Sequence, residues 1–345
     1  MLVKNRHLAR LGLVAILASV LIVACQNNLE QNFASQSPAT EIENCRMVEH
    51  DTGETEICGQ PQRVVALSPY ILDMMLSLGV EPVGYSAADM SETMLRQSEF
   101  DNPDKQIPYL GQRLTTQPVN LGDRHSPSLE GLAQLQPDLI LGEAWQGDQG
   151  KYQLLSQIAP TVLVDDQQGG WQRSIQTLAQ ALDQESELEQ SKAAYEAAIA
   201  EARTQLSSVA AKYPQVLLIS SGSLSQGINT YHCSEFSRLL ESLGFQLVHL
   251  TNPSNCYSTL SLEVLPQTNA DIIFVVAWDA DDQGSARGWQ KLQQAWQQTP
   301  ILQQMPVTQA GRVYFIDAQL STIRGPIAAD IILQKYLEKL TPLAE

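Results

Sequence analysis

Short apolar runs alternate with stretches of helical periodicity along the first half of this chain. Strands are expected at residues 63–68, 83–86, 139–142 and 161–165, with helices near 71–78 and 129–135. Strands that alternate with helices in this way form parallel sheets covered on both faces. We therefore expect the first half to fold as a doubly wound α/β lobe.

The second half repeats the pattern. It has predicted strands at 216–220, 246–250, 272–277 and 313–317, and a last helix at 327–340 that begins just after Pro326. The sequence Ser-Leu-Glu ends at Glu130 and again at Glu263, and each copy is a predicted short helix leading to a buried strand. The chain is thus expected to form two similar α/β lobes with a ligand cleft between them.

A long polar helix is predicted to join the lobes. Residues 184–206 contain no Gly or Pro and are rich in Ala, Glu and Gln, while Leu188, Tyr195, Ile199 and Leu206 recur at helical spacing. A single helix of that length would span about 35 Å. We place the lobes at 41–170 and 213–345 and the helical linker region at 171–212, and we expect the lobes to tilt rather than hinge widely.

The amino terminus has the features of an export signal. Residues 1–24 contain three basic and no acidic residues and end in an apolar run. Ile22-Val23-Ala24-Cys25 resembles a bacterial lipobox, which implies lipidation of Cys25; a plain secretion signal with a chance cysteine is the alternative. Residues 25–40 are rich in Gln, Asn and Ser and are expected to form a disordered tether. These features predict an exported protein, lipid-anchored at the periplasmic face of a membrane.

Charge and cysteine content limit the partners and the sites. Without residues 1–24 the chain has 18 basic and 38 acidic residues, which disfavours nucleic acid and suits a monomer that docks onto a basic partner. The four cysteines besides Cys25 allow three disulfide connectivities, and the nearest-neighbour pairs, one in each lobe, are preferred. A thiolate zinc site is the alternative, although the chain has no C-x-x-C pair. The preferred pairs are Cys45 with Cys58 and Cys233 with Cys256.

Common catalytic and nucleotide-binding motifs are absent. The sequence contains no G-x-S-x-G, Walker, G-x-G-x-x-G or H-E-x-x-H motif, and we predict no catalytic residue. Two other classes stay open: a metal-ion receptor using His125 and His232, and an exported enzyme that acts on a chelate or cofactor. No two histidines have the spacing of a helical metal site.

Three segments together carry a family resemblance. Residues 63–69 (RVVALSP), 122–130 (GDRHSPSLE) and 135–140 (LQPDLI) are similar to segments of the helical-backbone substrate-binding proteins that serve bacterial ABC importers for iron siderophores, haem and vitamin B12. The resemblance spans about residues 63–340. It implies a receptor without enzymatic activity that delivers a ferric siderophore, of hydroxamate or citrate type, to an ABC permease. Iron(III) would arrive within the ligand, with no intrinsic cofactor, and vitamin B12 or haem is the alternative ligand.

The resemblance also implies roles for single residues. Arg124 would contact the ferric chelate, and Glu130 and Glu263 would each dock onto one copy of a two-fold permease. The structural alternatives are a surface or capping arginine and first-turn glutamates that stabilise a helix dipole. Arg324 lies where the family often has a Trp-x-R-G loop, but the tryptophan is missing here, which favours a more polar ligand. Further pocket residues are the aromatic side chains that follow strand ends: Tyr70, Trp145, Tyr231 and Trp278.

Overall fold

The structure is a computed structural model that describes residues 44–87, 103–165, 170–278 and 288–344. The predicted signal, Cys25 and the tether lie outside these described residues. Residues Arg46–Glu345 form one compact unit, and Met1–Cys45 belong to another. Within the described ranges, no helix is both long enough and apolar enough to cross a membrane.

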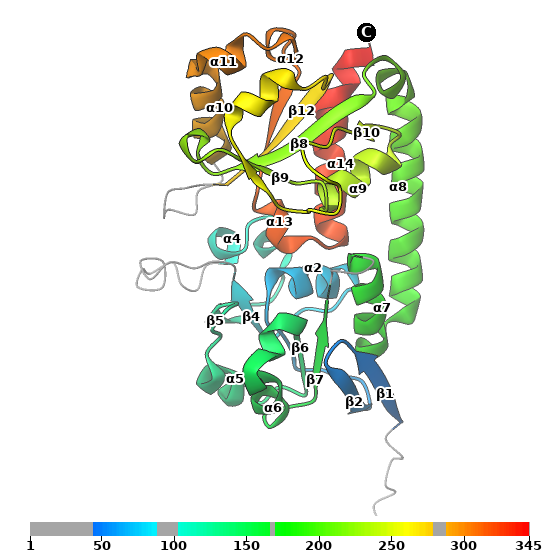
Figure 1. Cartoon of the computed structure of the whole chain (residues 1–345). Helices are drawn as coiled ribbons and strands as arrows, with labels where there is room; N and C mark the ends of the chain where they lie inside the picture. The colour runs from blue at the N-terminus through cyan, green and yellow to red at the C-terminus, as the bar shows by residue number, and fades with distance from the viewer. Residues whose placement is uncertain (1–43, 88–102, 166–169, 279–287, 345) are drawn as a thin grey trace, which may run out of the picture. The chain divides into compact units, whose positions relative to one another are not determined.

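The first sheet is parallel throughout and confirms the predicted α/β lobe (Figure 1). Successive residues of its central strand face opposite sides of the sheet. On one side, Val64 packs in a cluster with α2 (Pro69–Ser77) and α7 (Trp171–Leu182). Val65 packs with α5 (Leu129–Leu135) and α6 (Lys151–Ser156) on the other side. The strand order is β5 (Val119–Asp123), β4 (Gly84–Ala87), β3 (Val64–Ala66), β6 (Leu139–Glu143) and β7 (Thr161–Val164).

The second sheet combines parallel and antiparallel strands. The strands β8, β12 and β13 run parallel to one another, with β13 at one edge, whereas β9 and β11 pair antiparallel towards the other edge. The strand predicted at 246–250 has only two residues, Gln246–Leu247 (β10), beside β8. The order is β11 (Thr259–Leu260), β9 (Ile228–Thr230), β8 (Gln215–Ser221), β12 (Ile272–Ala277) and β13 (Val313–Asp317).

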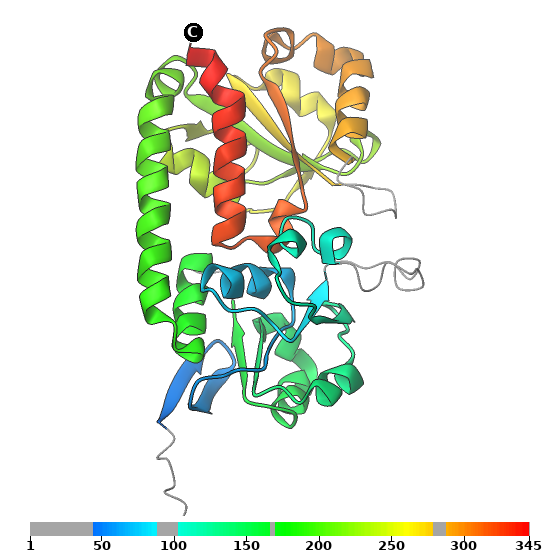
Figure 2. The ribbon, with the colours of Figure 1, turned by 180° about the vertical axis from the view of Figure 1, so that it is seen from behind.

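A 28-residue helix, α8 (Glu185–Lys212), connects the lobes and runs past both sheets (Figure 1). At 1.5 Å per residue it is about 42 Å long, longer than predicted. The last helix, α14 (Pro326–Leu340), lies beside it (Figure 2). One buried apolar cluster extends from β3 and α2 through α14 and α8 to β8 and β12. This shared core favours the predicted stiff connection over a flexible hinge.

The two Ser-Leu-Glu copies both begin helices, of different kinds. Ser128 caps α5 by accepting a hydrogen bond from the Gly131 backbone N–H (3.1 Å). Ser261 caps η4 (Leu262–Gln267), which is a 3-10 helix and contains Pro266. Because proline lacks the backbone donor and clashes with the preceding turn, a regular α-helix is disfavoured there.

The remaining elements connect these parts. A two-stranded sheet, β1 (Cys45–His50) and β2 (Gly53–Cys58), precedes the first lobe. The other described helices are α4 (Pro103–Gln106), η1 (Gly111–Arg113), η2 (Ala144–Gly150), η3 (Leu224–Gln226), α9 (Glu235–Ser242), α10 (Gly288–Gln298), α11 (Pro300–Gln303), α12 (Pro306–Gln309), α13 (Leu320–Ile323) and η5 (Thr341–Ala344).

The disulfides follow the preferred pairing. Cys233 and Cys256 are joined, and Cys45 and Cys58 are each disulfide-bonded. Cysteines bonded in this way have no free thiolates to offer the alternative zinc site. Replacing Cys233 and Cys256 together by Ser is expected to lower the free energy of unfolding by about 3 kcal/mol, because the bond closes a loop of roughly 23 residues in the unfolded chain. Urea unfolding of the wild type and the double variant measures this difference, and equal midpoints and slopes would contradict it.

Candidate functional site

Arg124 lies in the loop after β5, and a buried amide fixes its backbone. The Arg124 N–H donates to the Ala87 carbonyl (2.9 Å). Gln146, only 4% exposed, donates through Nε2 to the carbonyls of Arg124 and Leu67, both at 2.8 Å. Its Oε1 accepts the backbone N–H of Glu143 (2.8 Å). Gln146 thus forms hydrogen bonds with the carboxyl ends of β3, β5 and β6, and ligands of α/β lobes bind at these strand ends.

Trp145 lies beside Arg124, as expected for two residues that share a binding surface. The Trp145 side chain is 36% exposed, and the Arg124 guanidinium carbon lies 5.9 Å from its ring centroid. The His125 ring lies 4.8 Å from the same ring. The first lobe therefore presents a cation and an open aromatic face next to each other.

A cavity of about 240 Å³ adjoins Arg124 and is lined by the first lobe alone. Half of its lining residues are leucine or proline, and Arg124 and Lys151 bring positive charge to it. It combines apolar surface with a few polar groups, which is typical of small-molecule sites. The lining residues are Leu67, Arg124, His125, Ser126, Pro127, Leu129, Gln146, Lys151, Leu154 and Leu155.

Arg324 belongs to the second lobe but pairs with the first. It follows α13 in a left-handed backbone conformation (φ 46°), and its Nη2 lies 2.5 Å from Oε2 of Glu143 at the end of β6. Its guanidinium carbon lies 4.6 Å from the ring centroid of Tyr70. Glu143 is 4% exposed and Tyr70 is fully buried. The predicted pocket residues Tyr70 and Arg324 therefore meet where the lobes adjoin, around a glutamate that the sequence did not single out.

Glu143 is ionised in this setting. Burial by itself would raise the pKa of its carboxyl group. The Arg324 charge, hydrogen bonding from Ser68 and Trp145, and the Arg124 charge outweigh that effect and hold the pKa below its ordinary value. Both candidate arginines thus act on one buried carboxylate.

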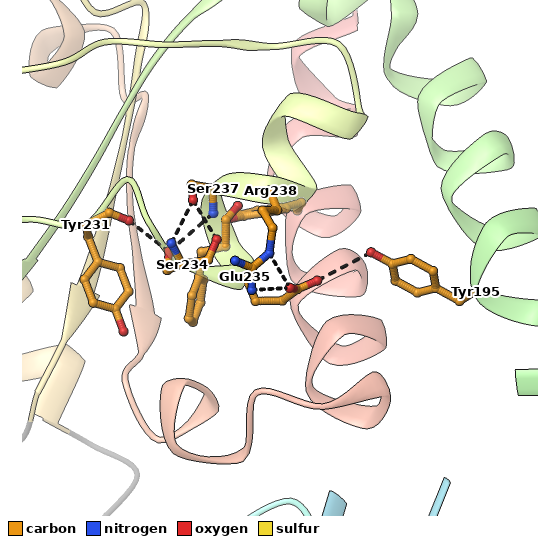
Figure 3. Close-up of polar contacts among 8 residues, drawn as sticks. Tyr195, Tyr231, Ser234, Glu235, Ser237 and Arg238 are labelled. Atoms are coloured by element: carbon orange, nitrogen blue, oxygen red, sulfur yellow. Dashed lines mark hydrogen bonds and ion pairs between the residues drawn. The ribbon is translucent and has the colours of Figure 1, made fainter. Parts of the chain in front are cut away.

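Tyr231 lies close enough to Arg324 for the Arg324 charge to act on its hydroxyl group. The Ser234 hydroxyl donates to the Tyr231 carbonyl (2.9 Å), and the Tyr231 ring points away from the nearby Glu235–Arg238 pair (Figure 3). The ring is 6% exposed, and burial raises the pKa of Tyr231 to about 12. The exposed ring of Tyr257 lies 6.2 Å from it. Tyr231 therefore has little surface open to a ligand, whereas its neighbour Tyr257 has much more.

The linker helix is bound to the segment that carries Tyr231. The Tyr195 hydroxyl on α8 donates to Glu235 (3.4 Å), and Glu235 pairs with Arg238 (2.9 Å) (Figure 3).

Trp278, the remaining predicted pocket aromatic, is half-buried after β12, and its backbone N–H donates to the Ser221 carbonyl (3.0 Å). Its side chain packs against the buried apolar cluster that includes Tyr70 and Tyr231.

Two further contacts join the lobes. Asp73 on α2 accepts the backbone N–H groups of Ile327 and Ala328, both at 2.9 Å, at the start of α14. The Tyr109 hydroxyl donates to Asp317 (2.8 Å). Neither Asp73 nor Glu143 was predicted as a site residue, because the sequence signal for them is weak. Asp73 is a single acid within an apolar helical run, and Glu143 is a single acid at the end of a buried strand.

The two predicted docking glutamates lie on different lobes and are both exposed. Glu130 occupies the first turn of α5, and Glu263 the first turn of η4. Leu129, next to Glu130, borders the cavity at Arg124, and Glu263 borders a second hollow of about 520 Å³. Each Ser-Leu-Glu copy therefore lies beside a concave surface.

The histidine alternative gains no support from the described residues, because none of their histidines belongs to a cluster of three or more metal-binding side chains. His125 packs on Trp145, whereas the His232 ring lies 5.0 Å from that of His249. His232 and His125 thus have separate neighbours.

Comparisons with known proteins agree with this architecture. The Fe(3+)-citrate-binding protein YfmC of Bacillus subtilis is 25% identical over 332 residues, which is 95% of both chains. The putative ABC transporter substrate-binding lipoprotein YhfQ of the same organism is 27% identical, over 96% of this chain and 98% of that protein. The crystal structure of Staphylococcus aureus SirA complexed with staphyloferrin B has the same fold, with a TM-score of 0.67 and 24% identity over 86% of this chain and 98% of SirA. Residues 64–320 match the family model described as periplasmic binding protein. The chain therefore belongs to the periplasmic binding protein family, whose members bind substrates.

Proposed function

We propose that this protein is a lipid-anchored receptor that captures a ferric siderophore of hydroxamate or citrate type and delivers it to an ABC permease. The anchor would be Cys25. The observation that supports the ligand class is the placement of Arg124 and Arg324, one from each lobe, around the buried Glu143. The two guanidinium groups outnumber the carboxylate in an otherwise acidic chain.

The chemistry of such chelates suits this arrangement. Ferric hydroxamate and citrate complexes present clustered oxygen atoms, and arginine offers planar, permanently charged donors that match them. Trp145 adds an open aromatic face beside Arg124. The relatives named for ferric citrate and ferric hydroxamate binding support the same class. Iron(III) is then part of the cargo, held by the chelator.

Binding is tested by tryptophan fluorescence with a panel of ligands: a ferric hydroxamate, ferric citrate, a ferric catecholate, haem and cobalamin. We expect the ferric chelates to change the fluorescence at low concentration. A response to haem or cobalamin alone, or to none of the ligands, would refute the proposal. Recovery of chemically unchanged chelator after release separates a receptor from an enzyme.

Replacing Arg124 by Ala is expected to weaken binding of ferric citrate by roughly tenfold to a hundredfold, because a charged donor to the chelate oxygens is lost. Arg203→Ala is the matched control, since Arg203 is exposed on α8 and its removal changes the total charge equally. Equal affinities of the Arg124 and Arg203 variants would show that Arg124 does not contact the ligand.

A further inference from the structure

Glu143 is a fixed negative charge between two candidate ligand-binding arginines. Its side chain is 5% exposed, whereas that of Arg324, whose Nη2 contacts the carboxylate, is 26% exposed. The Glu143 backbone is held by Gln146. The residues next to the carboxylate therefore give it little freedom to move away when a ligand arrives.

Arg324 is held equally firmly. The Tyr70 ring packs against its guanidinium, and Gly325, which follows it, packs so closely against Asp73 that a side chain would not fit. Pro326 then begins α14. The Glu143–Arg324 ion pair is thus held in place at the junction of the lobes and is not formed by two flexible surface side chains.

A buried charge next to a binding site acts on every charge that the ligand carries. With Glu143 ionised, the three groups Arg124, Arg324 and Glu143 add to one positive charge instead of two. Each additional negative charge on a ligand meets the repulsion of Glu143, and this repulsion is strong because the surroundings exclude water. A ferric trihydroxamate, in which three hydroxamates neutralise the metal, avoids it.

We propose that Glu143 is a specificity-determining residue that limits the negative charge of the accepted chelate and thereby favours weakly charged ferric complexes over strongly anionic ones. This inference rests on the proposed function and deepens it. It assigns to Glu143 an effect on the choice among ferric chelates, beyond that of joining the two lobes.

The test is the ratio of two affinities, measured for ferric citrate with its free carboxylates and for a neutral ferric trihydroxamate. Glu143→Gln keeps the size of the side chain and its hydrogen-bonding capacity. It is expected to raise the affinity for ferric citrate relative to the trihydroxamate at least tenfold, with a steeper salt dependence for citrate. Glu241→Gln is the matched control, because Glu241 is exposed on α9 and carries the same charge. A ratio that stays within twofold of the wild type overturns the inference, since a merely structural role would change both affinities alike.

A second pair of variants covers the case in which Glu143→Gln does not fold. Arg324→Gln retains the Glu143 charge, and Arg324→Gln combined with Glu143→Gln removes it without leaving an unpaired arginine. The ratio should be at least tenfold higher in the double variant, and equal ratios refute the inference. Wild-type protein that binds no ferric chelate refutes the proposed function and this inference together, whereas normal wild-type binding with unchanged ratios refutes the inference alone.

Discussion

Replacing Asp73 by Asn is expected to lower the free energy of unfolding by about 3 kcal/mol. Both carboxylate oxygens of Asp73 accept backbone N–H groups at the first turn of α14. An amide has one acceptor oxygen, so one donor in this fully buried place would face an NH₂ group instead. Because α2 and α14 belong to different lobes, the change weakens the junction as well as the helix terminus.

The Asp73 contact also predicts a pH dependence with a definite sign. Burial raises the pKa of Asp73 to about 7, although hydrogen bonds from the backbone of Ile327, Ala328 and Gly325 and from Ser77 act in the opposite direction. In the unfolded chain the pKa returns to near 4. Between about pH 4 and 7 the folded protein therefore binds more protons, and the contribution of this group to stability falls as the pH rises.

Urea unfolding at pH 5 and pH 8 measures both effects. The difference in stability between wild type and Asp73→Asn should be larger at pH 5 than at pH 8. Asp330→Asn is the matched control, since Asp330 is exposed on the same helix α14 and should change stability by less than about 0.5 kcal/mol at either pH. A difference that is independent of pH, or a variant as stable as the wild type, contradicts the role given to Asp73.

Local sequence patterns predicted most of the fold. α5, β12 and β13 have the predicted bounds, because each is an apolar or amphipathic segment with a clear start. The strand β5 was missed, since its sequence VNLGD contains two polar residues and a glycine. α8 extends six residues beyond the predicted end at Leu206, because residues 207–212 contain neither Gly nor Pro.

The sequence predicted the candidate site only in part. Arg124 and Trp145 were predicted from family segments and strand ends, and they do lie together. The pairing of Glu143 with Arg324 spans 181 positions and depends on how two lobes meet, which periodicity within either lobe does not encode. The tyrosines at 70 and 231 follow strand ends as predicted, yet both are buried, since they belong to the apolar cluster that extends through both lobes.

Replacing Glu130 and Glu263 together by Ala is expected to reduce uptake of the ferric chelate by at least tenfold while leaving its binding unchanged. Both side chains are exposed, so their removal should change stability by no more than about 0.5 kcal/mol. Neither Glu130 nor Glu263 lines the cavity at Arg124, and ligand affinity should therefore persist. Loss of a charge pair at an interface commonly costs 2–5 kcal/mol when the partner charge is left buried and unpaired, and two such losses act on one docking event.

The measurement is uptake of radiolabelled iron by cells that depend on this receptor, together with fluorescence titration of the purified variant. Because one glutamate lies on each lobe, a two-fold symmetric permease would meet the two charges with equivalent basic sites, and each single variant should retain part of the uptake. Glu201→Ala with Glu241→Ala removes two exposed charges elsewhere and should leave uptake unchanged. Normal uptake by the Glu130 and Glu263 double variant would show that these residues only stabilise the first turns of their helices. Lost ligand binding in that variant would instead place the glutamates in the ligand site.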